Sequence, residues 1–518
     1  MQACVVRRRF HTWETPAVGG GSTVCYMPLY PAYGTPTALL AFWNSGGYDL
    51  NTAGTSTTDV TIGASFMGPL DTAPGTTTPR SWWTSFADNV ATSTSNRANS
   101  ITRYITYGST LGTDIYLQIT GLSLGSGFAS FTLGAPTAKQ PSHLDVVFVA
   151  FYGPSVGIGT QPWGAVGTPV TVANLAFSPD LILFGGSSSA LGGRSTGTDA
   201  RFGFGAAWKS GAATTAQFST TCKLENGLTT QQIYQLNCNT GVVQTISGTT
   251  AAQTIAQNNS TCDFITNTGF QFTPAGTANW GFQYMALKSD QSSNDFWLGE
   301  YQAASATGNS FNSFGSTGFV PSVVFGSATA QTVFNAVAST NITPITDTYC
   351  LFAGMCQDPP VMDGGGTIST TNGSLNVTGS GTTFGYLAQG MQLYTTNNTL
   401  VGVVSTITSN TALTLATAAT ATNTNINYTY KQSGQYVIFW GQQDALNGNT
   451  NVHSGIADSF GVMYTNTGTP ATSFVGTLNN PDTRNGYEIN FTTVNANYRA
   501  RGFVVGVKDT TVKRRNPT

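Results

Sequence analysis

The chain has 518 residues, more than one compact core usually holds, and this length suggests about three domains of roughly 150 residues each. Only 8% of the residues are charged and the formal net charge is −2, but 40% are hydrophobic and 11% aromatic, which argues against a wholly disordered chain. Seven of the 20 basic residues lie within the first nine or the last eleven positions, so the body between them is acidic and lacks a nucleic-acid-binding face.

The basic ends of the chain comprise Arg7 to Arg9 and Lys508 to Arg515. We expect both termini to be solvated or disordered, with contact to an acidic neighbour as the alternative. The N-terminal arginines follow a very short apolar run, whereas an export signal places basic residues before a long one. No apolar run approaches the roughly 20 residues of a membrane helix, so we expect neither a signal peptide nor membrane insertion.

The amino-acid composition favours β-strands. Thr, Val, Ile, Phe and Tyr are abundant, whereas strong helix formers are scarce. The seven cysteines are odd in number and scattered without CxxC pairs, so neither a disulfide framework nor a zinc site is expected. The sequence predicts buried free thiols, with a bridge between Cys222 and Cys238 across a hairpin as the alternative.

Three segments of the chain resemble one another: residues 35–66, 178–208 and 434–464. Each has an apolar strand, a loop rich in Gly, Asn and Ser, and a second strand that mixes small and aromatic residues. Aligned without a gap, they predict repeated units, and a partial fourth copy begins at Pro321. The matching positions are Phe42 and Ile62, Phe184 and Phe204, and Trp440 and Phe460.

Each repeat ends on an apolar strand that is followed at once by Gly, Ser or Asp turn signals. Strands that are apolar at every position indicate that both faces are covered, and strands that mix small and aromatic residues are typical of sandwich interiors. The predicted fold class is therefore all-β, with tandem repeated β-sandwich-like domains and a small inserted β module in the third. The predicted domains are 1–155, 156–290 and 291–518.

The inserted module is predicted at residues 364–431, of which 364–430 contain no charged, His or Cys side chain. The pair Asn372-Gly373 predicts a two-residue hairpin in which both residues have positive φ. Leu375 and Val377 are then expected on one face of the following strand. The exposed surface of the module is predicted at the turn residues Asn372, Gly373, Asn397 and Asn398.

The segments "NGSLNVTGSGTTF", "GMQL" and "VSTITSNTALTLA" resemble a small β module that recurs in tail-fibre and other virion proteins of tailed bacteriophages. The resemblance covers the inserted module, a small part of the chain, and carries over no catalytic residue. It implies a structural or host-adhesion component of a virion, often an oligomer.

From this resemblance we expect a tail-fibre or tail-associated protein that acts in assembly and host-surface binding, with a capsid-surface decoration or fibre protein as the alternative. The expected partners are further copies of the chain, with a trimer favoured, other virion proteins, and a host-surface glycan or protein. The expected location is the virion, after assembly in the host cytoplasm. No cofactor is expected.

Catalytic patterns are weak in this sequence. Ser155 lies in a Gly-x-Ser-x-Gly pattern after a strand, but the helix that a nucleophile elbow needs does not follow it. His11, His143 and His453 are isolated from one another, so a triad or a His-based metal site would need distant loops to meet. We therefore expect no enzymatic activity.

A polysaccharide depolymerase is the enzyme alternative, because the two carboxylates of a glycosidase can come from anywhere in the chain. The acids are few and mostly lie beside turns, where Asp commonly caps the backbone. The stretch "DALNGNTN" lacks the spacing and carboxylate count of a calcium loop, so no metal is expected. The acids that adjoin turns are Asp263, Asp290, Asp444 and Asp458.

Trp82 and Trp83 are the candidate contacts for a glycan or receptor, because they lie in the polar stretch "RSWWTSFADN". Adjacent side chains of a strand cannot both face the same core, so exposure of one of the two at the surface is the alternative that would make it such a contact. Packing in a core or at a subunit interface is the favoured interpretation, since large aromatic side chains also anchor such contacts.

Overall fold

The structure is a computed structural model of the 518-residue chain. It describes residues 2–30, 33–45, 48–49, 59–69, 77–87, 95–108, 114–138, 143–189, 191–192, 194–197, 199–210, 214–225, 232–249, 252–258, 262–265, 268–276, 281–289, 295–302, 307–313, 321–329, 348–356, 361–432, 434–443, 451–457, 461–464, 472–479, 486–494 and 501–508.

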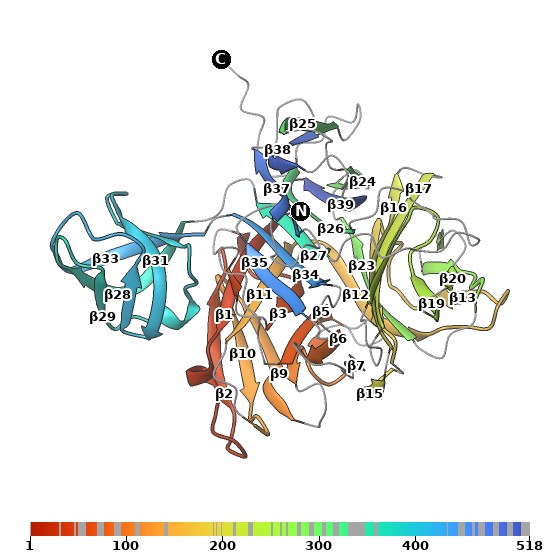
Figure 1. Cartoon of the computed structure of the whole chain (residues 1–518), viewed down its shortest axis with the longest axis horizontal. Coiled ribbons are helices and arrows are strands. Elements are labelled where there is room, and N and C mark those ends of the chain that lie inside the picture. Colours follow the sequence, from red (N-terminus) through yellow and green to blue (C-terminus); the bar gives the residue numbers. More distant parts are fainter. Residues whose placement is uncertain are drawn as a thin grey trace.

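Strands dominate these residues, which confirms the all-β prediction (Figure 1). Two short 3-10 helices are η1 (Thr12–Glu14) and η4 (Phe384–Tyr386). The described ranges contain no α-helix, and so none that is long and apolar enough to cross a membrane.

The first sandwich consists of an inner and an outer antiparallel sheet. Its inner sheet has the order β1 (Gln2–Phe10), β11 (Leu144–Tyr152), β3 (Ala38–Asn44), β5 (Asp59–Pro69), β6 (Thr77–Ala87) and β7 (Ser95–Ser100). Its outer sheet has the order β2 (Thr23–Pro28), β10 (Phe128–Gly134), β9 (Ile115–Gly125) and β8 (Ile105–Gly108).

The second sandwich repeats this arrangement. Its inner sheet has the order β12 (Ser155–Pro162), β23 (Gly281–Lys288), β14 (Leu181–Ser187), β16 (Asp199–Ser210), β17 (Thr214–Glu225) and β18 (Gln232–Cys238). Its outer layer contains β13 (Val170–Val172), β22 (Gly269–Phe272) and β21 (Asp263–Ile265), together with the hairpin of β19 (Gln244–Thr249) and β20 (Ala252–Asn258).

The third sandwich has the same strand order. Its inner sheet contains β24 (Phe296–Gln302), β39 (Arg501–Lys508), β26 (Pro321–Thr329), β27 (Thr348–Cys356), β34 (Gln435–Gln443) and β35 (Asn451–Ala457). Its outer sheet contains β25 (Gly308–Ser313), β38 (Gly486–Val494), β37 (Thr472–Asn479) and β36 (Gly461–Tyr464). In all three inner sheets the first strand along the chain pairs with the last, and the last pairs with the second.

The gapless repeat alignment is wrong in two respects. The third-domain counterparts of β3 and β5 are β26 and β27, the first of which begins at Pro321. The segment 434–464 instead begins with β34, which is the fourth strand of its inner sheet when the strands are counted along the chain. Phe42 also points toward the centre of the molecule, 5.1 Å from Phe204, while Phe184 lies in the core of its own sandwich, 5.5 Å from Phe270. A shift of one residue along a strand exchanges its two faces.

Trp43, one residue beyond Phe42, is therefore the counterpart of Phe184. Its indole N–H donates a hydrogen bond of 3.0 Å to the carbonyl of Thr106 in the outer strand β8. The ring lies over Gly63, where an added Cβ would come within 2.2 Å of it. A glycine on the neighbouring strand thus provides the space for a tryptophan in the first sandwich.

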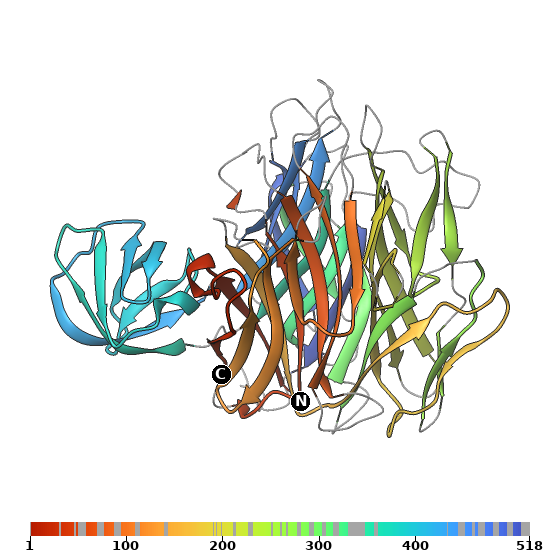
Figure 2. The same ribbon diagram turned by 90° about the horizontal axis from the view of Figure 1, so that it is seen from below.

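The three inner sheets share one central core, and Figure 2 shows them side by side. Between the first and second sheets the Phe42 and Phe204 rings are 5.1 Å apart, and between the second and third the Phe204 and Phe503 rings are 5.6 Å apart. Phe151 and Phe325 connect the first and third sheets at 6.1 Å. Each inner sheet is thus covered by its own outer layer and by the other two inner sheets.

The inserted module is a closed six-stranded barrel that stands beside the body (Figure 1). Its first and last strands pair at the point of attachment, where Val361 lies opposite Lys431. The strand order around the barrel is β28 (Val361–Thr370), β29 (Asn376–Ser380), β32 (Ala412–Leu415), β31 (Leu400–Ser409), β30 (Gln392–Thr395) and β33 (Asn423–Lys431).

The predicted two-residue hairpin in the barrel is wrong. Thr370 pairs with Val377, so the loop is longer, and within it Ser374 N donates to the Thr371 carbonyl at 2.9 Å. Gly373 has a φ of 81°, whereas Asn372 keeps a negative φ. Leu375 lies before β29 and is exposed, while Val377 is buried, because the alternation of faces begins only where the strand does.

Phe204 tests the shared core because it contacts aromatic rings of both other inner sheets and is 1% exposed. Phe204→Ala should lower the free energy of unfolding by about 3–5 kcal/mol, through lost burial and the cavity that remains. Phe128→Ala, on the exposed face of β10, should cost less than about 1 kcal/mol. Urea unfolding measures both, and equal losses would contradict a shared core at Phe204.

Candidate functional site

The structure buries both tryptophans that the sequence singles out as candidate contacts. Trp82 is 0% and Trp83 2% exposed, which agrees with the favoured packing in a core, and neither lies at the surface. They do face opposite sides of β6, but each side is covered. The Trp82 ring lies 4.8 Å from Phe66 and 6.0 Å from Phe202, over Gly185 of the second sandwich. Trp82 therefore packs between the first two sandwiches and offers no surface to a ligand.

The four turn residues of the barrel are exposed: Asn372, Gly373, Asn397 and Asn398. Both turns point away from the attachment of the barrel. Along β28 the pairing runs from Val361 opposite Lys431 to Thr370 opposite Asn423, and β30 ends in the same direction with Thr395 opposite Tyr428. The far end of the barrel therefore presents uncharged groups: exposed amide and hydroxyl side chains together with the exposed side chains of Leu375 and Leu400.

Asn398 holds the second of these turns in shape. It adopts a φ of 61°, a conformation that asparagine tolerates better than most residues, and its N–H donates to the carbonyl of Thr395 at 2.9 Å. The N–H of Thr395 in turn donates to the carbonyl of Thr399 at 2.8 Å. The turn is thus a defined surface whose available groups are backbone and side-chain amides.

Arg7 and Arg8 are buried in β1 and Arg9 is mostly covered, which corrects the expectation of a solvated N-terminus. Asp145, on the neighbouring strand β11, accepts from Arg7 Nη2 at 3.1 Å and from Arg9 Nε and Nη2 at 3.0 Å each. Burial alone would raise the pKa of the Asp145 carboxyl, but the charges of Arg9 and Arg7 hold it well below its usual range.

Arg8 points to the other face of β1 and also reaches the barrel. Its guanidinium donates to Glu14 Oε1 at 2.5 Å and to the carbonyl of Gly385 in η4, and it lies 4.9 Å from the centre of the Phe10 ring. A buried arginine that meets a carboxylate, a carbonyl and an aromatic face has its charge compensated on three sides. We call Arg7, Arg8, Arg9, Glu14 and Asp145 the arginine junction.

The arginine junction attaches the barrel to the edge of the first inner sheet. The backbone N–H of Arg7 donates to Gln432 Oε1 at 2.8 Å, and Arg7 Nη1 donates to the carbonyl of Gln389 at 3.4 Å. Gly385 fits closely, since an added Cβ would lie 2.8 Å from Trp13 and 2.9 Å from Glu14. Because β1 is an edge strand, the barrel also covers backbone groups that would otherwise be open to pairing with another chain.

Two of the three histidines adjoin this junction. His143 Nε2 lies 3.1 Å from Asp145 Oδ2, and the His11 ring stacks on Trp13 at 5.0 Å. Burial, then the charges of Arg8 and Arg9, lowers the pKa of His11 to about 3, so its imidazole stays neutral at physiological pH. The side chain of His453 lies outside the described residues. These contacts compensate buried charge and bring no nucleophile to either imidazole.

The other candidate chemical groups are separated from one another. Ser155 is the first residue of β12, opposite Lys288 in a continuous antiparallel ladder, which is not the strand-to-helix turn of a nucleophile elbow. Asp263 lies in β21, and the other three turn acids, Asp290, Asp444 and Asp458, are not among the described residues. Within the described ranges no three His, Cys, Asp or Glu side chains are placed to hold a metal ion.

The described cysteines are buried free thiols: Cys4, Cys25, Cys222, Cys238 and Cys262. The alternative of a bridge between Cys222 and Cys238 is wrong, because Cys238 lies opposite Ser219 and Cys222 opposite Gln235. Burial raises the pKa of the Cys25 thiol to about 12 and that of Cys222 further, so both stay protonated and unreactive.

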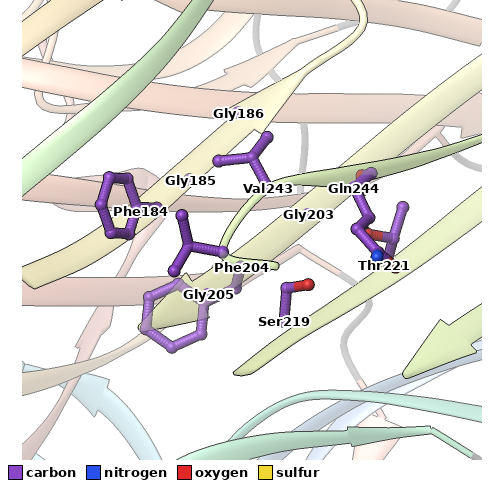
Figure 3. A pocket seen from close by; sticks show the side chains of 11 residues that line it. Phe184, Gly185, Gly186, Gly203, Phe204, Gly205, Ser219, Thr221, Val243 and Gln244 are labelled. Carbon is purple, nitrogen blue, oxygen red and sulfur yellow. Dashed lines mark hydrogen bonds between the residues drawn. The ribbon is translucent and has the colours of Figure 1, made fainter. Parts of the chain in front are cut away.

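A small hollow lies between the inner sheet of the second sandwich and the segment before β19 (Figure 3). Phe184, Gly203 and Gly205 line it together with Val243 and Gln244. Gly205 is required there, since an added Cβ would lie 2.1 Å from the Val242 carbonyl oxygen. The hollow encloses about 10 Å³, room for one water molecule, and its lining includes no charged side chain. It does not have the size or the groups of a substrate site.

Comparison with known proteins gives no matching family model, no similar curated protein and no similar solved structure.

His11 makes the stability of the protein depend on pH. Between pH 6.5 and about 3 the unfolded chain binds a proton at His11 that the folded chain does not, so the free energy of unfolding should fall as the pH falls. The slope due to this group is at most about 1.4 kcal/mol per pH unit. Urea unfolding of the wild type and of His11→Gln at a series of pH values measures it.

The His11→Gln variant should lose less stability than the wild type on going from pH 7 to pH 4. Above pH 6.5 the imidazole is neutral in both states, so there the two proteins should show the same pH dependence. Parallel curves down to pH 4 would contradict a neutral buried His11.

Proposed function

We propose that the protein is a structural component of a bacteriophage virion, most specifically a tail-fibre or tail-associated protein that acts in assembly and host-surface binding. The observation that carries this proposal is the inserted barrel, whose sequence resembles a module of phage virion proteins and whose exposed end is uncharged. A capsid-surface decoration or fibre protein is the alternative within the same class.

The way the barrel is attached supports a role in presenting a surface. Its strands close on themselves, so it has its own core, and it meets the body through η4, Gln389 and Gln432. The turns at Asn372 and Asn398 lie at its opposite end. A module held at one end by buried arginines and exposed at the other is suited to contact a partner beyond the body.

The chemistry of the exposed turns indicates how such a partner would be bound. Residues 364–430 carry no charged side chain, so contacts would use amides, hydroxyls, backbone groups and the exposed Leu375 and Leu400. Such contacts depend little on ionic strength, unlike the binding of nucleic acid by Lys and Arg. Other virion proteins and a host-surface glycan or protein are partners of this chemistry.

The test begins with location. Mass spectrometry and immunogold electron microscopy of particles, purified from a lysate of the cells that carry the gene, should find the protein in the particle and show whether it lies at the tail or at the capsid. Its absence from purified particles that contain their other structural proteins would overturn the proposal.

The role of the barrel is tested by a variant that lacks residues 364–430. Because Lys431 lies opposite Val361 on paired strands, a short Gly-Ser linker can join it to Asp363, the other remaining end. The labelled full chain should bind the cells that carry the gene with little dependence on salt concentration. The variant should fold but bind these cells at least about tenfold more weakly, a loss of about 1.4 kcal/mol in binding free energy. Equal binding of the two proteins would exclude the barrel as the contact.

A further inference from the structure

The three inner sheets have the same strand order and pack around one core, an arrangement typical of three identical chains in a homotrimer. Each has six strands of its own in the same order, and each contributes aromatic side chains to one central core. Phe42, Phe204 and Phe503 come from the first, second and third sheets and are at most 1% exposed. The faces through which three separate sandwiches would associate are thus already covered within one chain.

Strand exchange strengthens this relation. The segment between β14 and β16 of the second sandwich contains β15 (Arg194–Gly197), which pairs with β7 at the edge of the first inner sheet. The equivalent segment between β3 and β5 of the first sandwich contains β4 (Tyr48–Asp49), which pairs with β35 at the edge of the third. The second sandwich thus extends the first, and the first extends the third.

Both exchanged strands join the same position in a neighbouring inner sheet, next to β7 or β35, which is the fifth strand of its sheet when counted along the chain. They differ in direction, since β15 is antiparallel and β4 parallel to its partner. In an assembly of identical chains, exchange of this kind would connect separate molecules. In this chain it connects successive repeats, together with polar contacts such as Gln283 Nε2 to the Ser81 carbonyl at 2.7 Å.

We propose that the body is a single-chain counterpart of a homotrimer: one chain forms the complete three-sandwich assembly and is a monomer in solution. The inserted barrel breaks the threefold repetition, since its strands belong to the third repeat alone. Each body therefore presents one barrel and engages a partner of the barrel once, where a homotrimer would engage it three times. This proposal replaces the homotrimer expected from the sequence and does not depend on a role in a virion.

The first measurement is the mass of the purified full chain by light scattering over a wide range of concentration. The result expected is the mass of one chain, 54.2 kDa, at every concentration. A mass of three chains would overturn the proposal, as would a mass that rises to that value with concentration.

A disulfide across β15 and β7 tests whether the exchange is internal. Arg194 and Ala98 are register partners, and cross-strand neighbours lie within the distance that a disulfide spans. Oxidised with oxidised glutathione, which takes up the two electrons, the double variant Arg194→Cys, Ala98→Cys should form a bridge within one chain, seen as a linked peptide pair in a protein of monomer mass. Covalent multimers, or a folded protein with no bridge, would overturn the proposal.

The matched control uses the two single variants, Arg194→Cys and Ala98→Cys, unfolded, mixed and refolded together. If the exchange is internal, the two cysteines are never opposite each other and no linked pair between chains forms beyond the background of wild type. A linked heterodimer in the mixture would show that β15 joins the sheet of another molecule and would overturn the proposal.

Discussion

The structure depends on one constraint, which is that its inner sheets are apolar on both faces. In β11 every residue from Leu144 to Tyr152 is buried, and the same holds for β3 and β14. A sheet of this kind must be covered twice. The outer layer of each sandwich provides one cover, and the other two inner sheets provide the second. The arrangement of the three repeats follows from this need.

The edges of these sheets impose a second constraint, because unpaired edge strands invite other chains. The exchanged strands β15 and β4 occupy two such edges, and the barrel with the arginine junction covers β1. Burying three arginines is costly unless each is paired, and Asp145 and Glu14 meet this requirement. The same contacts that compensate the charge therefore determine which end of the barrel faces solvent.

Much of the architecture is predictable from local sequence, because strand propensity, apolar runs and turn signals act over a few residues. The position of the barrel is also predictable, because its uncharged residues 364–430 interrupt the third repeat. The arginine junction is not predictable in this way, since Arg7 meets Asp145 and Gln432 only after strands far apart in the chain have paired. An apolar run directly before the three arginines is the one local signal that a buried strand continues through them. The burial of Trp82 likewise depends on Gly185 of another repeat. A gapless alignment also hides a difference in spacing, because Trp43 lies opposite Gly63 whereas its counterpart Phe184 lies opposite Gly205, one residue farther along the chain.

Through their common core the three sandwiches are expected to unfold as one cooperative unit. Native-state amide hydrogen exchange measures this cooperativity most directly, because it gives an opening free energy for each strand. If the core is shared, β3, β14 and β26, which are the second strands along the chain in the three inner sheets, open together with the same free energy, equal to that of global unfolding of the body. Three distinct opening free energies, one for each sandwich, would contradict it.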